Sequence, residues 1–405
     1  MSALPLKPDP LHNVGVAYEH VPLAFQYLTH SGINNGNDQG EIPMPSSIQI
    51  VRTAVFAGTV AVGMAALQPL ANAADNFTMR IAAGHPAAPL SQVNQLQKTF
   101  VPNVTKRVAA ETDHTIRFIE GYGGTIANLF EVLESTQKGL VDFGSICSCF
   151  EPTKLFVHNL NYFTPFISGD PKIMGPTTRQ IHKEFDYFSK NFDQYNQIFL
   201  GGGAVDDYGL GTTFAWSKMS DLKGVKIGAA GPNLPWLDFA GAAKVQTNLN
   251  EVYNALQSGV YDGVVIFPAP YFGFKFGEVA KYYTTMGWGS VTAYPLAVNK
   301  DSWAKLPASV QKIIREEIPV YEAAIEDEST IKYVTALENL KKQGVTVRDL
   351  DPAVRREMAQ AIEPWVNQKA QEYEAAGVPG KATFRRLIEL AQENGAKPVH
   401  IYTIK

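Results

Sequence analysis

The stretch Gln137-Lys138-Gly139-Leu140-Val141-Asp142 recurs later in the chain as Gln257-Ser258-Gly259-Val260-Tyr261-Asp262, in the shared pattern Q-x-G-x-x-D. In each copy a helical pattern precedes the glycine and an apolar run follows the aspartate. A glycine in the left-handed conformation commonly ends a helix, so each copy predicts a helix followed by a strand. The recurrence indicates two similarly built lobes.

Short apolar runs alternate with helical patterns around both copies. Strands are predicted at 77–81, 116–119 and 141–146, with helices at 91–110 and 125–138 between them. This alternation predicts an α/β protein with largely parallel sheets. Parallel sheets place ligands beyond the carboxyl ends of their strands, so two such lobes predict a ligand cleft between those ends.

Two helical segments carry more specific expectations. The helix that begins at Thr125 should place Ile126, Leu129, Phe130 and Leu133 on one apolar face. Apolar residues also recur with helical spacing across 308–343, and Pro319 lies inside that pattern. Because proline lacks the amide N–H that a helix needs, we expect Pro319 to kink or divide this helix.

The composition excludes several classes of protein. The 405 residues are 45% hydrophobic and 18% charged, which is enough apolar material for a folded core. With 35 basic and 39 acidic residues the chain has no excess of positive charge of the kind that binds nucleic acid. No G-x-S-x-G elbow and no H-E-x-x-H motif is present, so we expect neither an enzyme nor a cofactor or resident metal.

Residues 44–73 have the pattern of a secretory signal peptide. Arg52 precedes an apolar run over 53–67, and Ala71-Asn72-Ala73 forms a cleavage site of the A-x-A type. The run is shorter than the roughly 20 residues that span a membrane. We expect residues 1–43 to be an upstream extension outside the fold, and the protein to be exported to the periplasm, cleaved near Ala73 and free of a membrane anchor.

Four further blocks of sequence identify a family resemblance. They are Asp221-Leu222-Lys223-Gly224-Val225-Lys226-Ile227 and the segments 251–263, 275–282 and 299–303. On these blocks the chain resembles the solute-binding proteins of tripartite ATP-independent periplasmic (TRAP) transporters over about residues 75–345. The resemblance implies a two-lobed periplasmic binding protein fold with a long helix spanning both lobes. It also implies a receptor that delivers a small organic solute to the membrane permease subunits.

The lobe boundaries follow from the predicted elements and the resemblance. Lobe I should comprise residues 77–203 and 292–330, and lobe II residues 204–291 and 331–400. Gly201-Gly202-Gly203 follows an apolar strand but lacks the G-x-G-x-x-G helix of dinucleotide sites. We expect this segment to be a crossing between the lobes, because a hinge needs residues free to take unusual backbone angles.

The chain departs from the family at two ligand positions. Where the family has an arginine that grips the solute carboxylate, this chain has Gly228, and where it has a supporting asparagine, this chain has Ile266. No arginine occurs between Arg179 and Arg315. Because a desolvated carboxylate without a partner costs several kcal/mol, we expect an atypical solute. Lys226, on the same strand, is an alternative partner.

The remaining candidate ligand contacts are mostly aromatic. Nine aromatic residues fall between Phe267 and Tyr294, which favours a flat or apolar solute, or a cation held over ring faces. The resemblance places His85, Tyr208, Trp236, Leu249, Phe267 and Trp288 near the cleft. Tyr122, Ile146 and Phe150 follow or end predicted strands of lobe I and complete the set.

Cys147 and Cys149 end the third predicted strand, where the family places side chains that touch solute. Three interpretations are open. The pair could form an exposed, easily reduced disulfide that acts as a redox device, or could hold a soft metal together with His85 or His158. The third is that both are small buried thiols. The first two give an alternative function as a redox-sensing or metal-binding module.

Overall fold

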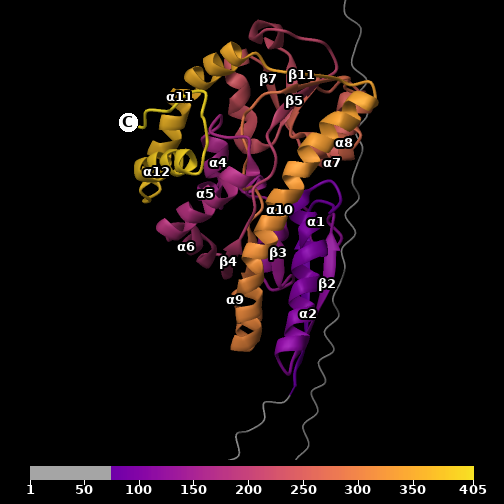
Figure 1. Ribbon diagram of the computed structural model, residues 1–405, viewed down its shortest axis with the longest axis vertical. Helices are drawn as coiled ribbons and strands as arrows, with labels where there is room; N and C mark the ends of the chain where they lie inside the picture. Colours follow the sequence, from indigo (N-terminus) through magenta and orange to yellow (C-terminus); the bar gives the residue numbers. More distant parts are fainter. Residues whose placement is uncertain (1–73) are drawn as a thin grey trace, which may run out of the picture. The chain divides into compact units, whose positions relative to one another are not determined.

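A computed structural model describes residues 74–405, which fold around two mixed β-sheets with helices packed against them (Figure 1). The strands of the first sheet are β1 (Asn76–Ala83), β2 (Thr115–Tyr122), β3 (Phe143–Ser145), β4 (Gln197–Gly201) and β10 (Leu296–Asn299). The strands of the second sheet are β5 (Gly209–Thr212), β6 (Lys226–Ala229), β7 (Ala243–Gln246), β8 (Gly263–Ile266), β9 (Tyr282–Thr285) and β11 (Thr346–Asp349). The predicted α/β class is confirmed.

Each sheet is parallel only in part. The first has the order β2-β1-β3-β10-β4, and β1 runs parallel to β2 and β3 whereas β10 is antiparallel to β3 and β4. The second has the order β11-β9-β5-β8-β6-β7, and β6 runs parallel to β7 and β8 whereas β5 is antiparallel to β8 and β9. The antiparallel strands are the first ones after the chain passes from one sheet to the other. β5 follows β4 of the first sheet, and β10 follows β9 of the second.

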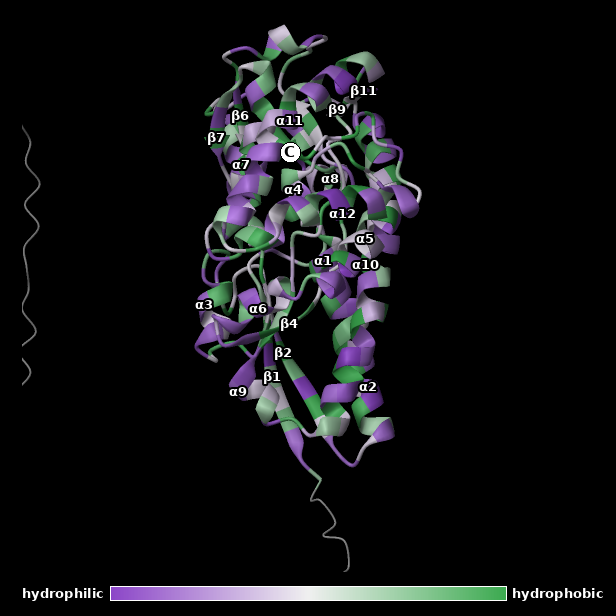
Figure 2. Ribbon diagram, turned by 90° about the vertical axis from the view of Figure 1, so that its left-hand side faces the viewer, coloured by the Kyte–Doolittle hydropathy of each residue, from purple (hydrophilic) through white to green (hydrophobic). Residues whose placement is uncertain are grey.

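The helices confirm the alternating pattern in most places. They are α1 (Ser91–Gln95), α2 (Val101–Glu111), α3 (Val132–Gln137), α4 (Leu160–Phe163), α5 (Pro171–Glu184), α6 (Tyr187–Asp193), α7 (Leu249–Gln257), α8 (Pro268–Gly273), α9 (Lys300–Ala304), α10 (Ala308–Lys342), α11 (Pro352–Ala375) and α12 (Gly380–Glu393). A π-helical turn at Leu96–Phe100 joins α1 to α2. Helix α2 buries Val101, Val104 and Val108, and Figure 2 shows hydrophobic and hydrophilic residues along its length.

The prediction of a helix that begins at Thr125 is wrong for the first half of that segment. Residues 125–131 form turns, and α3 begins only at Val132. Ile126 is 40% and Phe130 52% exposed, while Leu133 is buried, so these residues do not share one buried face. Asn128 breaks the pattern, because its side-chain oxygen accepts a hydrogen bond from the Phe130 amide in a local turn.

Helix α10 runs unbroken through Pro319, so the predicted division of this helix is wrong. It packs against α1, α2 and α5 beside the first sheet and against α8 and β11 beside the second (Figure 1). The Tyr321 hydroxyl donates a hydrogen bond of 2.6 Å to the Gln92 carbonyl, which ties the middle of α10 to α1. The long packed surface on both sides of Pro319 outweighs the loss of one helical hydrogen bond.

The Gly201-Gly202-Gly203 segment passes close to α10 as the chain leaves β4. A Cβ atom on Gly203 would lie 2.7 Å from Cβ of Ile325, so only glycine fits at this crossing. The Gly202 amide donates to Glu322 of α10 at 2.9 Å. Arg179 of α5 pairs with Glu326 and lies 3.6 Å from the Glu322 carboxylate. These three charged residues, Arg179, Glu322 and Glu326, are called the α10 ion triad below.

The C-terminal helices pack back across the molecule. Asn394 after α12 donates to Thr177 of α5 at 2.9 Å, and the Tyr402 hydroxyl donates to the Pro165 carbonyl at 2.8 Å. Each sheet draws its strands from within one predicted lobe. The first of these contacts joins residue 394 of the predicted lobe II to helix α5 of the predicted lobe I, and the second joins residue 402, beyond the predicted lobe II, to the segment after α4. The lobe boundaries stay a proposal.

Two predictions fall on residues 1–73, namely the upstream extension and the signal peptide at 44–73. They lie outside the described residues. Between residues 74 and 405, no helix has the length and apolar character needed to span a membrane.

Candidate functional site

A cavity lies where strands of the two sheets end. Its lining comes from the segments that follow β1, β3, β6 and β8, which is the position predicted for a ligand cleft. The lining residues are His85, Leu90, Cys147, Cys149, Phe150, Tyr162, Tyr208, Ala229, Ala230, Asn233, Thr247, Asn248, Leu249, Val252, Val264, Val265, Ile266, Phe267 and Tyr294. They come from both predicted lobes.

The cavity is narrow, with a volume of about 40 Å³. An engineered protein cavity that binds benzene measures about 150 Å³, so this one is smaller than a single aromatic ring requires. An organic solute can therefore enter only when the lining side chains or the two lobes move apart.

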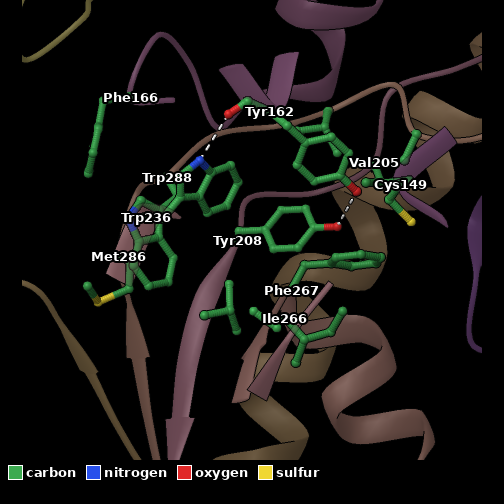
Figure 3. Packing of buried hydrophobic residues seen from close by; sticks show 14 of the residues in the cluster. Cys149, Tyr162, Phe166, Val205, Tyr208, Trp236, Ile266, Phe267, Met286 and Trp288 are labelled. Atoms are coloured by element: carbon green, nitrogen blue, oxygen red, sulfur yellow. Dashed lines mark hydrogen bonds between the residues drawn. The ribbon is translucent and has the colours of Figure 1, made fainter. Parts of the chain in front are cut away.

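Aromatic rings form one wall of the cavity (Figure 3). The ring of Tyr208 lies 5.2 Å from that of Phe267 and 5.9 Å from that of Tyr162, both in edge-on arrangements. The two tyrosine hydroxyls share a hydrogen bond of 3.0 Å. Edge-on contacts between buried rings hold them in fixed orientations, so this wall is a rigid surface against which a flat solute can pack.

Seven of the twelve predicted site residues line the cavity: His85, Cys147, Phe150, Tyr208, Leu249, Ile266 and Phe267. They are brought together because each ends, follows or precedes a strand, or begins a helix, at the same edge of its sheet. Ile266 ends β8 and Phe267 precedes α8, for example, whereas Leu249 begins α7.

The other five predicted site residues lie outside the cavity lining. Trp236 and Trp288 stand behind the aromatic wall with ring centroids 5.5 Å apart, and the Trp236 indole donates to the Tyr162 carbonyl at 2.9 Å. Ile146 is buried among core residues such as Leu133 and Phe192. Tyr122 is half-buried at the end of β2, and Gly228 lies within β6.

Gly228 lies beneath the ring of Tyr261. A Cβ atom at this position would be 3.0 Å from that ring and 3.0 Å from the methyl group of Thr247. The Tyr261 hydroxyl and the Thr247 hydroxyl are hydrogen-bonded at 3.0 Å, and Tyr261 is only 2% exposed. Tyr261 therefore fills the space that a side chain at position 228 would need.

Several lining residues are not among the twelve predicted from the sequence, among them Tyr162, Asn233, Thr247 and Tyr294. Asn233 lies in the 3-10 segment Gly231–Ala240 that follows β6. It is fully buried, and neither atom of its amide has a hydrogen-bond partner within residues 74–405. Its position in the segment that follows β6 is a signal that the sequence contains, whereas its unpaired state depends on neighbours far apart in the sequence.

The cavity carries no formal charge at neutral pH. No aspartate, glutamate, lysine or arginine is found among the described residues that line it. His85 is 1% exposed, and burial lowers the pKa of its imidazole to about 4, so this ring is neutral. Burial also raises the pKa of Asp206, close to Tyr208 in the chain, to about 8, which keeps this carboxyl protonated.

Cys147 and Cys149 form a disulfide in the cavity wall. The interpretation as two buried free thiols is therefore wrong, and the predicted bond is present. Its predicted exposure is wrong, because Cys147 and Cys149 are only 3% and 4% exposed. A bonded pair cannot supply the two thiolates that the metal interpretation requires. In the part of the chain that the structure describes, no three histidine, cysteine, aspartate or glutamate side chains are grouped as metal ligands.

A larger groove of about 930 Å³ lies elsewhere, between residues 152–157, the Gly231–Ala240 segment and α11. Exposed side chains such as Lys190 line it, and of the described strands only β7 reaches it, through Gln246 at the edge of the second sheet. The smaller cavity is the candidate site, because it lies at the strand ends and contains buried polar groups that need a partner.

Comparison with known proteins decides the family. The profile of the bacterial extracellular solute-binding proteins, family 7, matches residues 93–372. The chain belongs to this family. The solute-binding proteins of TRAP transporters that the sequence resembles are the same group, so the predicted resemblance is confirmed.

Curated relatives of the family 7 chain match it in part. The C4-dicarboxylate-binding periplasmic protein of Rhodobacter capsulatus is 34% identical over 113 residues, which are 27% of this chain and 33% of that protein. The monocarboxylate 2-oxoacid-binding periplasmic protein of Nostoc sp. is 25% identical over 248 residues, 54% of this chain and 60% of that protein. The chain thus spans less than two thirds of the length of these relatives.

Solved structures of family 7 proteins share the fold. A Bordetella pertussis receptor that binds pyroglutamic acid has a TM-score of 0.66 at 18% identity, with 78% of this chain and 99% of that chain covered. A Rhodoferax ferrireducens TRAP solute-binding protein in complex with copurified benzoate has a TM-score of 0.68 at 16% identity, covering 78% and 98%. These similarities show a two-lobed periplasmic binding protein fold.

Proposed function

We propose that the chain is the extracytoplasmic solute receptor of a TRAP-type transporter. It binds a small organic solute in the cavity between the sheets and delivers it to the membrane permease subunits, without chemical conversion. The observation that carries this proposal is the cavity itself, which lies at the strand ends and takes its lining from both predicted lobes of a family 7 chain. Such a position lets closure of the lobes enclose a solute.

Export to the periplasm is part of the same proposal. The pattern at residues 44–73 supports it, and so does the disulfide between Cys147 and Cys149, because disulfides persist in oxidising compartments such as the bacterial periplasm.

The solute is atypical for the family, on this proposal. Relatives and neighbours bind C4-dicarboxylates, 2-oxoacids, pyroglutamate or benzoate according to their names. Here Gly228 and Ile266 replace the residues that the resemblance assigns to carboxylate recognition. Lys226, the alternative partner, has an exposed side chain and lies outside the cavity lining.

Native mass spectrometry of the protein purified from a bacterial periplasm tests the receptor function. We expect one equivalent of a small organic molecule to remain bound in the wild type and to be lost in Leu249→Arg, which puts a long charged side chain into the cavity. Asn250→Arg is the matched control, because this neighbouring residue is exposed and outside the lining. Purification with no solute, or retention in Leu249→Arg, would contradict the proposal.

Redox sensing is a second candidate function, favoured by the disulfide in the cavity wall. Because the bond closes a very short loop, it should stabilise the protein by about 2 kcal/mol or less. A sensor should therefore show a small stability change but a large binding change. We expect Cys147→Ser/Cys149→Ser to bind the copurified solute at least tenfold more weakly in calorimetry. Equal affinity in this variant and the wild type would exclude the redox role.

A further inference from the structure

Asn233 presents a buried, unpaired amide to the cavity. Resting on the receptor function proposed above, we propose that the solute is an uncharged amide or lactam whose N–H and C=O groups pair with the Asn233 side chain.

Asn233 is completely buried beside the cavity. The residue is 0% exposed, and both Nδ2 and Oδ1 lack a hydrogen-bond partner among the protein groups of residues 74–405. Its backbone amide is fixed by a hydrogen bond of 3.3 Å to the Ala230 carbonyl. An unsatisfied buried polar group costs about 1–3 kcal/mol, so a solute that satisfies both atoms gains this energy on binding.

The chemistry of the amide selects its partner. Nδ2 donates and Oδ1 accepts, so the complementary group must carry an acceptor beside a donor. A primary amide or a lactam has this arrangement on adjacent atoms and can form two parallel hydrogen bonds with Asn233. A carboxylate has only acceptors, so it would leave Oδ1 unpaired and place two oxygens opposite each other.

The absence of charge in the lining excludes a carboxylate on a second ground. No cationic side chain of the described residues lines the cavity, and His85 is neutral because burial depresses the pKa of its imidazole. An ionised carboxylate moved into this site would lose its hydration without gaining a counter-ion, which costs several kcal/mol. Binding a neutral amide does not have this free-energy cost, because the amide has no charge that needs a counter-ion.

His85 supplies a second polar contact. Its Nδ1 lies within hydrogen-bond distance of the Tyr294 hydroxyl, and its Nε2 is buried without a partner in the described chain. When Nδ1 accepts from Tyr294, Nε2 carries the proton and can donate to a solute oxygen. Of the other polar lining residues, Thr247 is hydrogen-bonded to the Tyr261 hydroxyl and Asn248 accepts from the Asn250 amide. The rest of the lining is apolar or aromatic, with Phe267 and Ile266 beside Tyr208 (Figure 3), and suits an apolar body.

Paired probes with the same body and a different polar group test the proposal. Calorimetric titration would compare benzamide with benzoate, nicotinamide with nicotinate, and pyroglutamide with pyroglutamate. We expect at least one amide to bind at least tenfold more tightly than its acid. We also expect Asn233→Leu to weaken amide binding at least tenfold while keeping or raising the melting temperature, because it removes a buried unpaired polar group. Asn250→Leu, outside the cavity, should bind like the wild type.

Three results would overturn the solute class. They are the absence of any pair in which the amide binds more tightly than its acid, amide binding that survives Asn233→Leu in a folded protein, and a failure of all three amides to bind. None of these three results contradicts the receptor function, which is tested separately by the copurified solute. A copurified carboxylate would overturn the amide proposal and support the receptor, whereas no copurified solute and no bound probe would count against both.

Discussion

Replacing Arg179 by methionine should lower the free energy of unfolding by about 3–5 kcal/mol at pH 8. Arg179 is the cation of the α10 ion triad, and the side chains of Glu322 and Glu326 are only 5% and 6% exposed. Methionine keeps the apolar part of the side chain but removes the cation that both buried carboxylates contact, and leaves Glu322 with only the Gly202 amide as a hydrogen-bond donor named above. Urea unfolding followed by circular dichroism would measure the loss.

The loss should depend on pH in a definite direction. Burial raises the pKa of Glu322 to about 7 and raises the pKa of Glu326, whereas Arg179 lowers both. Between the unfolded value near 4.5 and about 7 the folded protein holds a proton that the unfolded chain lacks, so stability falls as pH rises through this window. Without Arg179 the pKa of both glutamates is higher, so the stability falls more steeply as the pH rises. The variant should therefore be close to the wild type at pH 5 and far below it at pH 8.

Arg386→Met is the matched control. Arg386 also contacts acidic groups on neighbouring turns and on α5, but its partner Glu184 is 29% exposed and Glu393 59% exposed. Surface pairs of this kind contribute about 0–1 kcal/mol. Equal losses in the two variants, or a loss in Arg179→Met that does not change between pH 5 and pH 8, would contradict the role of burial in the triad.

Gly228→Arg should destabilise the protein by about 3 kcal/mol or more rather than create a carboxylate receptor. The new Cβ would lie 3.0 Å from the Tyr261 ring, and the guanidinium would be forced into a wall that offers it no acidic partner. Urea unfolding and titration with succinate would measure both effects. Ala243→Arg is the control, because it adds the same side chain at an exposed position of the same sheet and should change stability by under 1 kcal/mol.

Tyr261→Val tests the cause of that loss. If the ring of Tyr261 is what crowds position 228, the double variant Gly228→Arg/Tyr261→Val should be more stable than Gly228→Arg alone. The coupling energy between two residues in direct contact is typically about 0.5–3 kcal/mol. Additive losses in the two single variants would show that the ring does not crowd position 228.

Much of the fold is local enough to be predicted from sequence. The strands at 77–81 and 116–119 have alternating or apolar patterns and appear as β1 and β2. The failures have non-local causes. Pro319 does not divide α10 because the helix is packed on both sides of the proline, and residues 125–131 do not form a helix because the Asn128 side chain stabilises a turn.

The candidate site was predictable to the extent that it depends on strand ends. His85, Cys147, Tyr208 and Phe267 follow or flank strands and reach the cavity. Trp236 and Trp288 lie at similar positions in the chain but pack one layer behind, and sequence spacing does not distinguish the layers. The importance of Asn233 depends on what it fails to contact, which only the three-dimensional neighbours of its amide reveal.

The contact between Gly228 and Tyr261 also constrains the order in which such a site can evolve. An arginine-bearing receptor could not acquire the tyrosine first, because the ring and the arginine would compete for one space. The arginine would have to be replaced before the tyrosine was gained. The intermediate would have an unfilled space beside position 228 and no cationic side chain to bind a carboxylate. An arginine at position 228 would therefore need a second change at Tyr261, so the single substitution Gly228→Arg is not expected to provide a carboxylate site.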